Sequence, residues 1–151
     1  MKPSKICNDQ LELFRSRLST QLSPNHPLIL LSKLINWEQF EEEFSNQFIE
    51  KIGQPAKPVR LVIGILMLQH MYGMSDENIV HRWIENPYWQ MFCGYDYLQH
   101  KLPMHPTSLI KWRHRIGESG LAKILGETIT AAVTTGIVKK KASRRLLQTQ
   151  P

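Results

Sequence analysis

Apolar positions recur along most of this chain at intervals of three and four residues, the spacing that places side chains on one face of an α-helix. The alternation of apolar and polar positions that marks half-buried strands is scarce. Helix-capping residues, prolines and glycines stand at the boundaries between the apolar segments. The pattern therefore predicts an all-α fold, a compact bundle of about seven helices.

Three helices are predicted in the first third of the chain. Leu11, Phe14 and Leu18 keep helical spacing, which predicts an opening helix near Gln10–Leu18. Pro27 suits the first turn of a second helix with the sequence HPLILLSKLI. Asn36 is expected to cap a third helix, which has one apolar and one acidic face. Its apolar residues are Trp37, Phe40, Phe44 and Phe48, and Glu41, Glu42 and Glu43 are expected to face solvent.

The middle of the chain predicts the organising helix of the domain. After the turn-rich segment GQPAKP, residues from Val59 to Tyr72 are apolar nearly all round, which is typical of a central, buried helix. Pro58 is expected to open this helix and Gly73 to end it. Ser75 is the expected N-cap of the next helix, which Pro87 ends. The inner face of that helix is Ile79, Val80, Trp83 and Ile84.

The remaining predicted elements lead to the domain boundary. Asn86–Gly94 is predicted to form a compact turn of helix, followed by a loop over residues 95–105. A helix is expected from Pro106 to Gly117, and a last helix from Leu121 to Thr135, where Gly136 ends it. Residues 1–137 are therefore predicted to form one helical domain, and residues 138–151 a disordered basic tail.

The Pro106–Gly117 helix is the strongest candidate for a functional element. The Thr107 and Ser108 hydroxyls are expected to accept hydrogen bonds from its first backbone amides. Leu109, Trp112 and Ile116 share one stripe, and Arg113 at the edge of that stripe is expected to pair with a carboxylate such as Glu85. A helix with one apolar side and one cationic side suits the major groove of DNA. The outer face predicted to contact DNA consists of Thr107, Ser108, Lys111, His114 and Arg115.

The distribution of charge agrees with a nucleic-acid partner. Residues 1–110 hold ten Lys and Arg against eleven Asp and Glu, whereas residues 111–151 hold nine against two. A basic excess confined to one region is the electrostatic footprint of a polyanion site. The alternative for the tail by itself is a solvated, disordered segment. The tail residues predicted to contact DNA are Lys139, Lys140, Lys141, Arg144 and Arg145.

Other functional classes find less support. The N-terminal sequence lacks the apolar core of a signal peptide, and the longest apolar run, Leu61–Leu68, is too short to span a bilayer. We therefore expect a cytoplasmic protein without a membrane partner. Its two cysteines, Cys7 and Cys93, are expected to be reduced thiols, with a single bridge as the alternative.

No metal site, cofactor or catalytic residue is predicted. Cys93, His100, His105 and His114 do not have the spacing of zinc ligands, and Cys93 fits a buried structural thiol. The Glu41–Glu43 run fits a solvated helix face, and no Asp or Glu follows Glu127. The aromatic residues of the 86–94 segment are interpreted as core rather than as base-stacking groups. These aromatic residues are Tyr88, Trp89 and Phe92.

Three segments together resemble the N-terminal domain of bacterial insertion-sequence transposases of the IS-five (InsH-type) group. They are HPLILLSKLINWEQFEEEF, then KPVRLVIGILMLQHMYGMSDENIVHRWIENPYWQMFCG, then LPMHPTSLIKWRHRIG with GLAKILGETI behind it. The resemblance covers roughly residues 10–141. It implies an all-helical domain that helps to recognise the terminal inverted repeats of the element. It also implies that an RNase H-like domain follows, with three acidic residues that bind Mg²⁺.

The chain departs from this pattern after the basic segment at Lys139–Lys141. In the family a strand with the first catalytic Asp follows, whereas this sequence continues to Pro151 without an acidic residue. We therefore expect a truncated, non-enzymatic transposase fragment. A frameshifted or prematurely stopped copy is the simplest account, and a partial clone is the alternative.

Two functional hypotheses follow from the sequence. In the first, the chain binds double-stranded DNA through a helix-turn-helix-like unit, with Ser75–Glu85 as support helix and Pro106–Ile116 as recognition helix. About twenty residues separate these helices, more than the usual turn. In the alternative, the helical domain is a protein-interaction module that dimerises with, or inhibits, full-length transposase.

Overall fold

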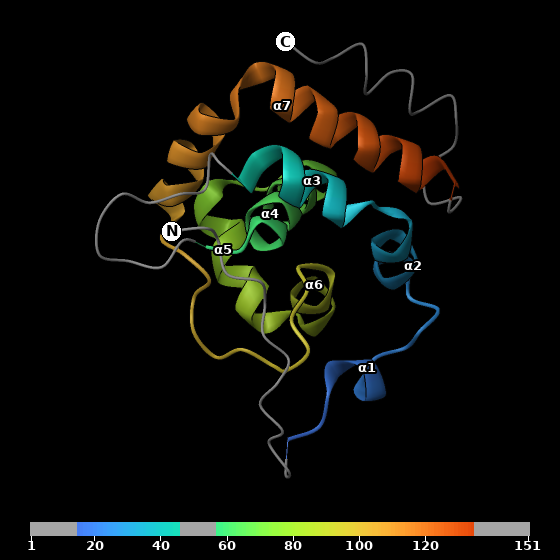
Figure 1. The fold of residues 1–151 in the computed structure, drawn as a ribbon. Helices are drawn as coiled ribbons and strands as arrows, with labels where there is room; N and C mark the ends of the chain where they lie inside the picture. Colours follow the sequence, from blue (N-terminus) through green and yellow to red (C-terminus); the bar gives the residue numbers. More distant parts are fainter. Residues whose placement is uncertain (1–14, 46–56, 135–151) are drawn as a thin grey trace.

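The computed structural model of the protein describes residues 15–45 and 57–134, in which it contains seven helices and no strand. The all-α prediction is confirmed (Figure 1). The helices are α1 (Leu18–Gln21), α2 (Pro27–Leu34), α3 (Trp37–Phe44), α4 (Val59–Tyr72), α5 (Asp76–Glu85), α6 (Pro87–Phe92) and α7 (Pro106–Thr134).

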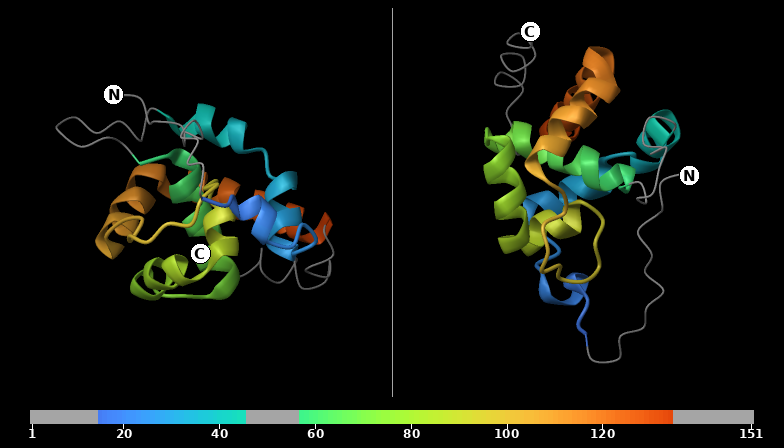
Figure 2. Two further views of the ribbon diagram at one scale, coloured as in Figure 1. Left: turned by 90° about the horizontal axis from the view of Figure 1, so that it is seen from below. Right: turned by 90° about the vertical axis from the view of Figure 1, so that its left-hand side faces the viewer.

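Helix α4 is the centre of the molecule, as its apolar circumference predicts. Every residue from Leu61 to Leu68 is buried. Helices α3, α5 and α7 pack against it, while α2 and α6 pack against each other on the opposite side from the start of α7 (Figures 1 and 2). A helix that is apolar all round is stable in such a central position, because its neighbours remove every face of it from water.

Local capping residues fix most of the helix boundaries. The side chains of Asn36, Ser75 and Asn86 each accept a hydrogen bond from the backbone amide three residues later, at 3.2–3.3 Å. Gly73 ends α4 with φ of 60° and ψ of 41°, a left-handed conformation that is strained for any residue with a Cβ. The predicted starts of α3, α5 and α6 and the predicted end of α4 are therefore confirmed.

The predicted opening helix at Gln10–Leu18 is wrong where the structure describes it. Residues 15–17 are not helical, and the short helix α1 begins only at Leu18. The Leu18 amide donates to the Asp96 carbonyl at 2.7 Å, and the Arg15 guanidinium donates to the Leu98 carbonyl at 2.6 Å. Contacts with the 95–105 loop thus replace the local helical hydrogen bonds. Residues 10–14, Phe48 and residues 135–151 lie outside the described residues.

Helix α7 changes direction at Gly117, which has φ of 75° and ψ of 171°. We call residues 106–116 the first arm and residues 118–134 the second arm. The predicted break at Gly117 is confirmed, but the second arm begins directly after it rather than at Leu121. A Cβ added at Gly120 would lie 3.0 Å from a ring carbon of Phe44. The second arm therefore packs closely against α3 (Figure 1).

Close packing between α4 and the end of α6 gives a first prediction. A Cβ added at Gly64 would lie 2.8 Å from the Cys93 sulfur, so Gly64→Ala is expected to lower the free energy of unfolding by about 1–2 kcal/mol. Urea denaturation measures this loss. In the Gly64→Ala, Cys93→Ala double variant the sulfur is absent and the new methyl group has room. The loss of stability in the double variant should therefore be smaller than the sum of the losses in the two single variants. A matched control is Gly126→Ala on α7, where an added Cβ meets nothing within 4 Å and no loss is expected.

Candidate nucleic-acid interface

The first arm of α7 begins with a histidine cap. The Thr107 amide donates to His105 Nδ1 at 3.2 Å, and the Thr107 hydroxyl lies 2.7 Å from the same nitrogen. Since Nδ1 accepts from the amide, it carries no proton, so the hydroxyl can only donate to it. The cap that the sequence assigned to the Thr107 and Ser108 hydroxyls is therefore supplied by His105.

The same device begins α2, where His26 Nδ1 accepts from the Leu28 amide at 3.2 Å. Both helices have the sequence His-Pro at this point, and the proline occupies the first helical position. A histidine before an N-terminal helix proline was thus a usable signal, although Ser, Thr, Asp and Asn are the usual caps. Local sequence fixes where the candidate face begins.

The apolar and polar sides of the first arm are separated as the helical spacing predicts. Leu109, Trp112 and Ile116 are buried with 0–4% exposure, so this stripe belongs to the core. On the opposite side, Ser108 is half-buried and the other predicted contact residues are exposed. These exposed residues are Thr107, Lys111, His114 and Arg115.

Arg115 has a restricted position on this face. Its guanidinium carbon lies 4.6 Å from the centroid of the Trp112 ring, in a cation–π arrangement. Because Trp112 is buried and fixed by the core, it holds the exposed guanidinium at one edge of the arm. A cation held in this way loses less conformational freedom when it meets an anion.

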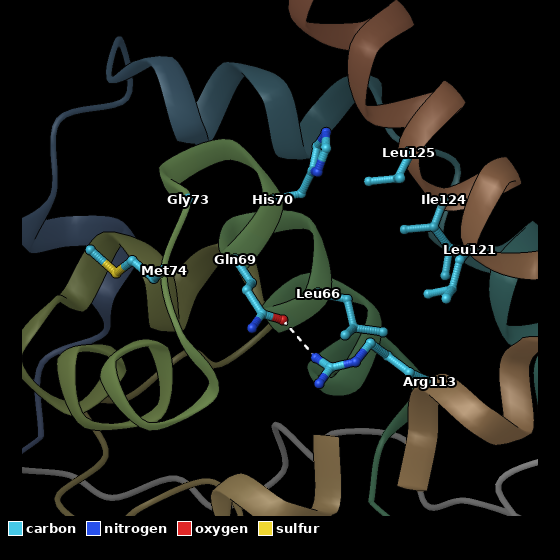
Figure 3. Close-up of a pocket in the computed structure, with 9 residues that line it drawn as sticks. All are labelled: Leu66, Gln69, His70, Gly73, Met74, Arg113, Leu121, Ile124 and Leu125. Carbon is cyan, nitrogen blue, oxygen red and sulfur yellow. Dashed lines mark hydrogen bonds between the residues drawn. The ribbon is translucent and has the colours of Figure 1, made fainter. Parts of the chain in front are cut away.

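Arg113 points the other way and ties three helices together. Its guanidinium donates to both carboxylate oxygens of Asp76 at 2.7 Å. It also donates to the Gln69 side-chain oxygen at 3.1 Å (Figure 3). Gln69 in turn donates to Asp76 at 2.6 Å. These hydrogen bonds lower the pKa of the Asp76 carboxyl and raise the pKa of Arg113. The expectation of a carboxylate partner is confirmed, but the partner is Asp76 and not Glu85.

A hollow of about 370 Å³ lies in the corner between α4 and the bend of α7 (Figure 3). Its wall is mainly apolar, and burial lowers the pKa of His70 at its edge. Among the residues that line it, the cationic side chain is Arg113, which is already paired with Asp76. Across residues 15–45 and 57–134, no three His, Cys, Asp or Glu side chains are grouped so that they could hold a metal ion.

A short connection joins α4 to α5, two helices that the sequence did not pair. Only Gly73, Met74 and Ser75 connect α4 to α5. The sequence proposed α5 as the support helix and the first arm of α7 as the recognition helix. In the structure, α5 follows α4 after this short connection, and α6 and a separate loop lie between α5 and α7. The exposed side chains of α5 carry both signs of charge, and its first turn is acidic. Exposed residues of α5 are Glu77, Asn78, His81, Arg82 and Glu85.

Charge therefore favours the first arm of α7 over α5 as the surface for a polyanion. The acids in the first turn of α5 would repel phosphates, whereas the exposed face of the arm carries Lys111 and Arg115 and no acid before Glu118. The predicted basic tail residues Lys139, Lys140, Lys141, Arg144 and Arg145 lie outside the described residues.

The aromatic residues of α6 serve the core, as interpreted from the sequence. Trp89 and Phe92 are buried. The half-buried Tyr88 stacks on His26 with 3.8 Å between ring centroids, and its hydroxyl accepts from the Ser23 amide at 3.1 Å. Cys93 is fully buried, and this burial raises the pKa of its thiol to about 12. It is thus an inert structural thiol.

No helix in the described part of the chain is long and apolar enough to cross a membrane.

No solved structure matches the chain significantly. A protein from Rhizobium meliloti described as "Uncharacterized protein ORF8 in nfe locus" is 38% identical over 146 residues, which cover 97% of this chain and 70% of that protein. The family model described as "Transposase domain (DUF772)" matches residues 16–115, from before α1 to the first arm of α7. The chain thus belongs to the DUF772 transposase-domain family.

Proposed function

We propose that this chain is the DNA-binding N-terminal part of an insertion-sequence transposase of the IS-five (InsH-type) group. In this proposal it recognises the terminal inverted repeats of the element as duplex DNA. Strand cleavage belongs to an acidic catalytic domain of the kind that the resemblance implies. Membership of a transposase-domain family supports a DNA-related role.

The observation that carries the proposal is the exposed cationic face on a firmly held helix. Lys111 and Arg115 lie on the solvent side of the first arm, while Leu109, Trp112 and Ile116 anchor its other side in the core. In a major groove, the cations would contact phosphates and supply most of the affinity. Thr107, Ser108 and His114 offer hydrogen-bonding groups for base edges.

A binding titration tests this proposal. Wild-type protein is expected to bind a duplex with the terminal inverted repeat more tightly than a scrambled duplex. The Lys111→Ala, Arg115→Ala double variant is expected to bind about 10–100-fold more weakly at low salt, with a smaller salt dependence, because two phosphate contacts are lost. Fluorescence anisotropy at two or more salt concentrations measures both effects.

The matched control removes two exposed cations from another part of the molecule. Arg17 is the N-cap of α1 and Lys33 lies on α2, and both side chains are exposed. Figures 1 and 2 show these two helices away from the first arm. The Arg17→Ala, Lys33→Ala variant has the same net charge as the test variant and should keep nearly full affinity. Equal losses in both variants would contradict the assignment of the face. Salt-resistant association with transposase that does not need Lys111 or Arg115 would favour the protein-interaction alternative.

A further inference from the structure

Ile110 is an exposed apolar side chain at the border of the candidate DNA face, between His114 and Arg113 on the helix surface. It is 45% exposed and follows Thr107 by three residues and precedes His114 by four. Residues at these intervals are neighbours on a helix surface, so the three form one exposed stripe along the first arm. Isolated exposed apolar side chains are common on proteins, so exposure alone does not indicate a role for Ile110. Its position beside Thr107 and His114 does.

The core does not account for Ile110. Leu109, Trp112 and Ile116 already bury the inner side of the arm with 0–4% exposure. A β-branched residue at an exposed helical position has a lower helix propensity than a straight-chain polar residue. Helix propensity and solubility therefore do not favour isoleucine at this position.

Charged groups border the stripe on both sides. Toward α5, Arg113 is committed to Asp76, with 2.7 Å between the paired atoms. On the other side, Lys111 and Arg115 are exposed, and Arg115 is held against Trp112. Thr107, Ile110 and His114 thus form a stripe without Lys or Arg, between Arg113 on one side and Lys111 and Arg115 on the other. Such a stripe suits a helix in a major groove, where it can meet base edges while the neighbouring cations meet phosphates.

We propose that the Ile110 side chain contacts the C5-methyl group of a thymine in the major groove, which makes Ile110 a specificity-determining residue. The thymine methyl is the apolar group that base pairs present in this groove, and apolar side chains recognise it. The Thr107 hydroxyl beside Ile110 already donates to His105, so it offers an acceptor rather than a competing donor. This inference rests on the proposed function, because it needs the first arm to enter the groove.

Replacing thymine with deoxyuridine tests the contact, because it removes the methyl group and leaves base pairing and charge unchanged. One inverted-repeat duplex has all its thymines replaced in this way. Wild-type protein is expected to bind it more weakly than the thymine duplex, by about fourfold for each methyl group contacted, because burial of one methylene-sized group changes the affinity by about this factor. Ile110→Ala should bind the thymine duplex more weakly and no longer distinguish the two duplexes. Ile110→Val should retain part of the discrimination. Single replacements along each strand should then locate the contacted thymine.

The control is Leu34→Ala on α2, which removes another exposed apolar side chain, 46% exposed, away from this face. It should discriminate between the duplexes as the wild type does. The inference is overturned if wild-type protein binds both duplexes equally, or if Ile110→Ala keeps the full preference for thymine. A wild-type protein that binds neither duplex at low salt would instead overturn the proposed function itself.

Discussion

Gln90→Leu is expected to lower the free energy of unfolding by about 3–5 kcal/mol, because it removes the side-chain partner of partly buried backbone groups of Ile84 and Gln99. Gln90 is fully buried on α6. Its side-chain nitrogen donates to the carbonyls of Trp83, Ile84 and Gln99 at 3.1–3.3 Å. Its side-chain oxygen accepts from the Gln99 amide at 2.7 Å. One amide side chain thus joins the end of α5 to the loop that leads into α7.

The measurement is urea denaturation followed by circular dichroism, with Gln99→Ala as the control. Gln99 takes part in this cluster through its backbone, and its side chain donates to the Tyr97 carbonyl. Truncating it should therefore cost less than about 1 kcal/mol. A loss for Gln90→Leu no larger than that of Gln99→Ala would show that the cluster contributes little. Because leucine has nearly the volume of glutamine, a cavity cannot explain a large loss.

Arg113→Met is expected to cost about 2–3 kcal/mol at pH 7, since it removes two charge-assisted hydrogen bonds and leaves the Asp76 carboxylate without its cation. Lys123→Met is the control. It breaks the pair between Lys123 and Glu43, where the lysine side chain is 62% exposed, so the effect should be at most about 1 kcal/mol. Chemical denaturation compares the two variants.

The same pair gives a pH dependence with a defined sign. The Arg113 guanidinium holds the folded-state pKa of Asp76 below its usual value of 3.8. A depressed carboxyl pKa contributes stability that is complete above the usual value and is lost as pH falls through the folded-state pKa. The stability difference between wild type and Arg113→Met should therefore be constant from pH 7 to about 5 and shrink below pH 4. A difference that stays constant down to pH 3 would contradict this assignment.

Most helix boundaries could be predicted because their causes are local. The caps at Asn36, Ser75 and Asn86 act on amides only three residues away, and Gly73 ends α4 through its own backbone conformation. The burial of α4 also followed from its composition alone. The two faces of the first arm were predicted for the same reason, since helical spacing fixes which residues share a side.

Predictions failed where a distant segment competed with a local preference. Helical spacing at residues 10–18 did not reveal that the Leu18 amide pairs with the Asp96 carbonyl. The edge position of Arg113 predicted a carboxylate partner such as Glu85, but the packing of α5 against α7 brings Asp76 to it instead. The histidine caps of α2 and α7 were local and were missed because histidine is an unusual capping residue.

The sequence by itself thus determined the helix content, the central position of α4 and the cationic face of the first arm. The tertiary structure decided how that face is held. Its orientation depends on Arg113 meeting Asp76 and Gln69, and on the bend at Gly117 that turns the second arm toward α3. The physical reason is range: caps and helical periodicity act within four residues, whereas these contacts join groups 37 and 44 residues apart, which only packing brings together.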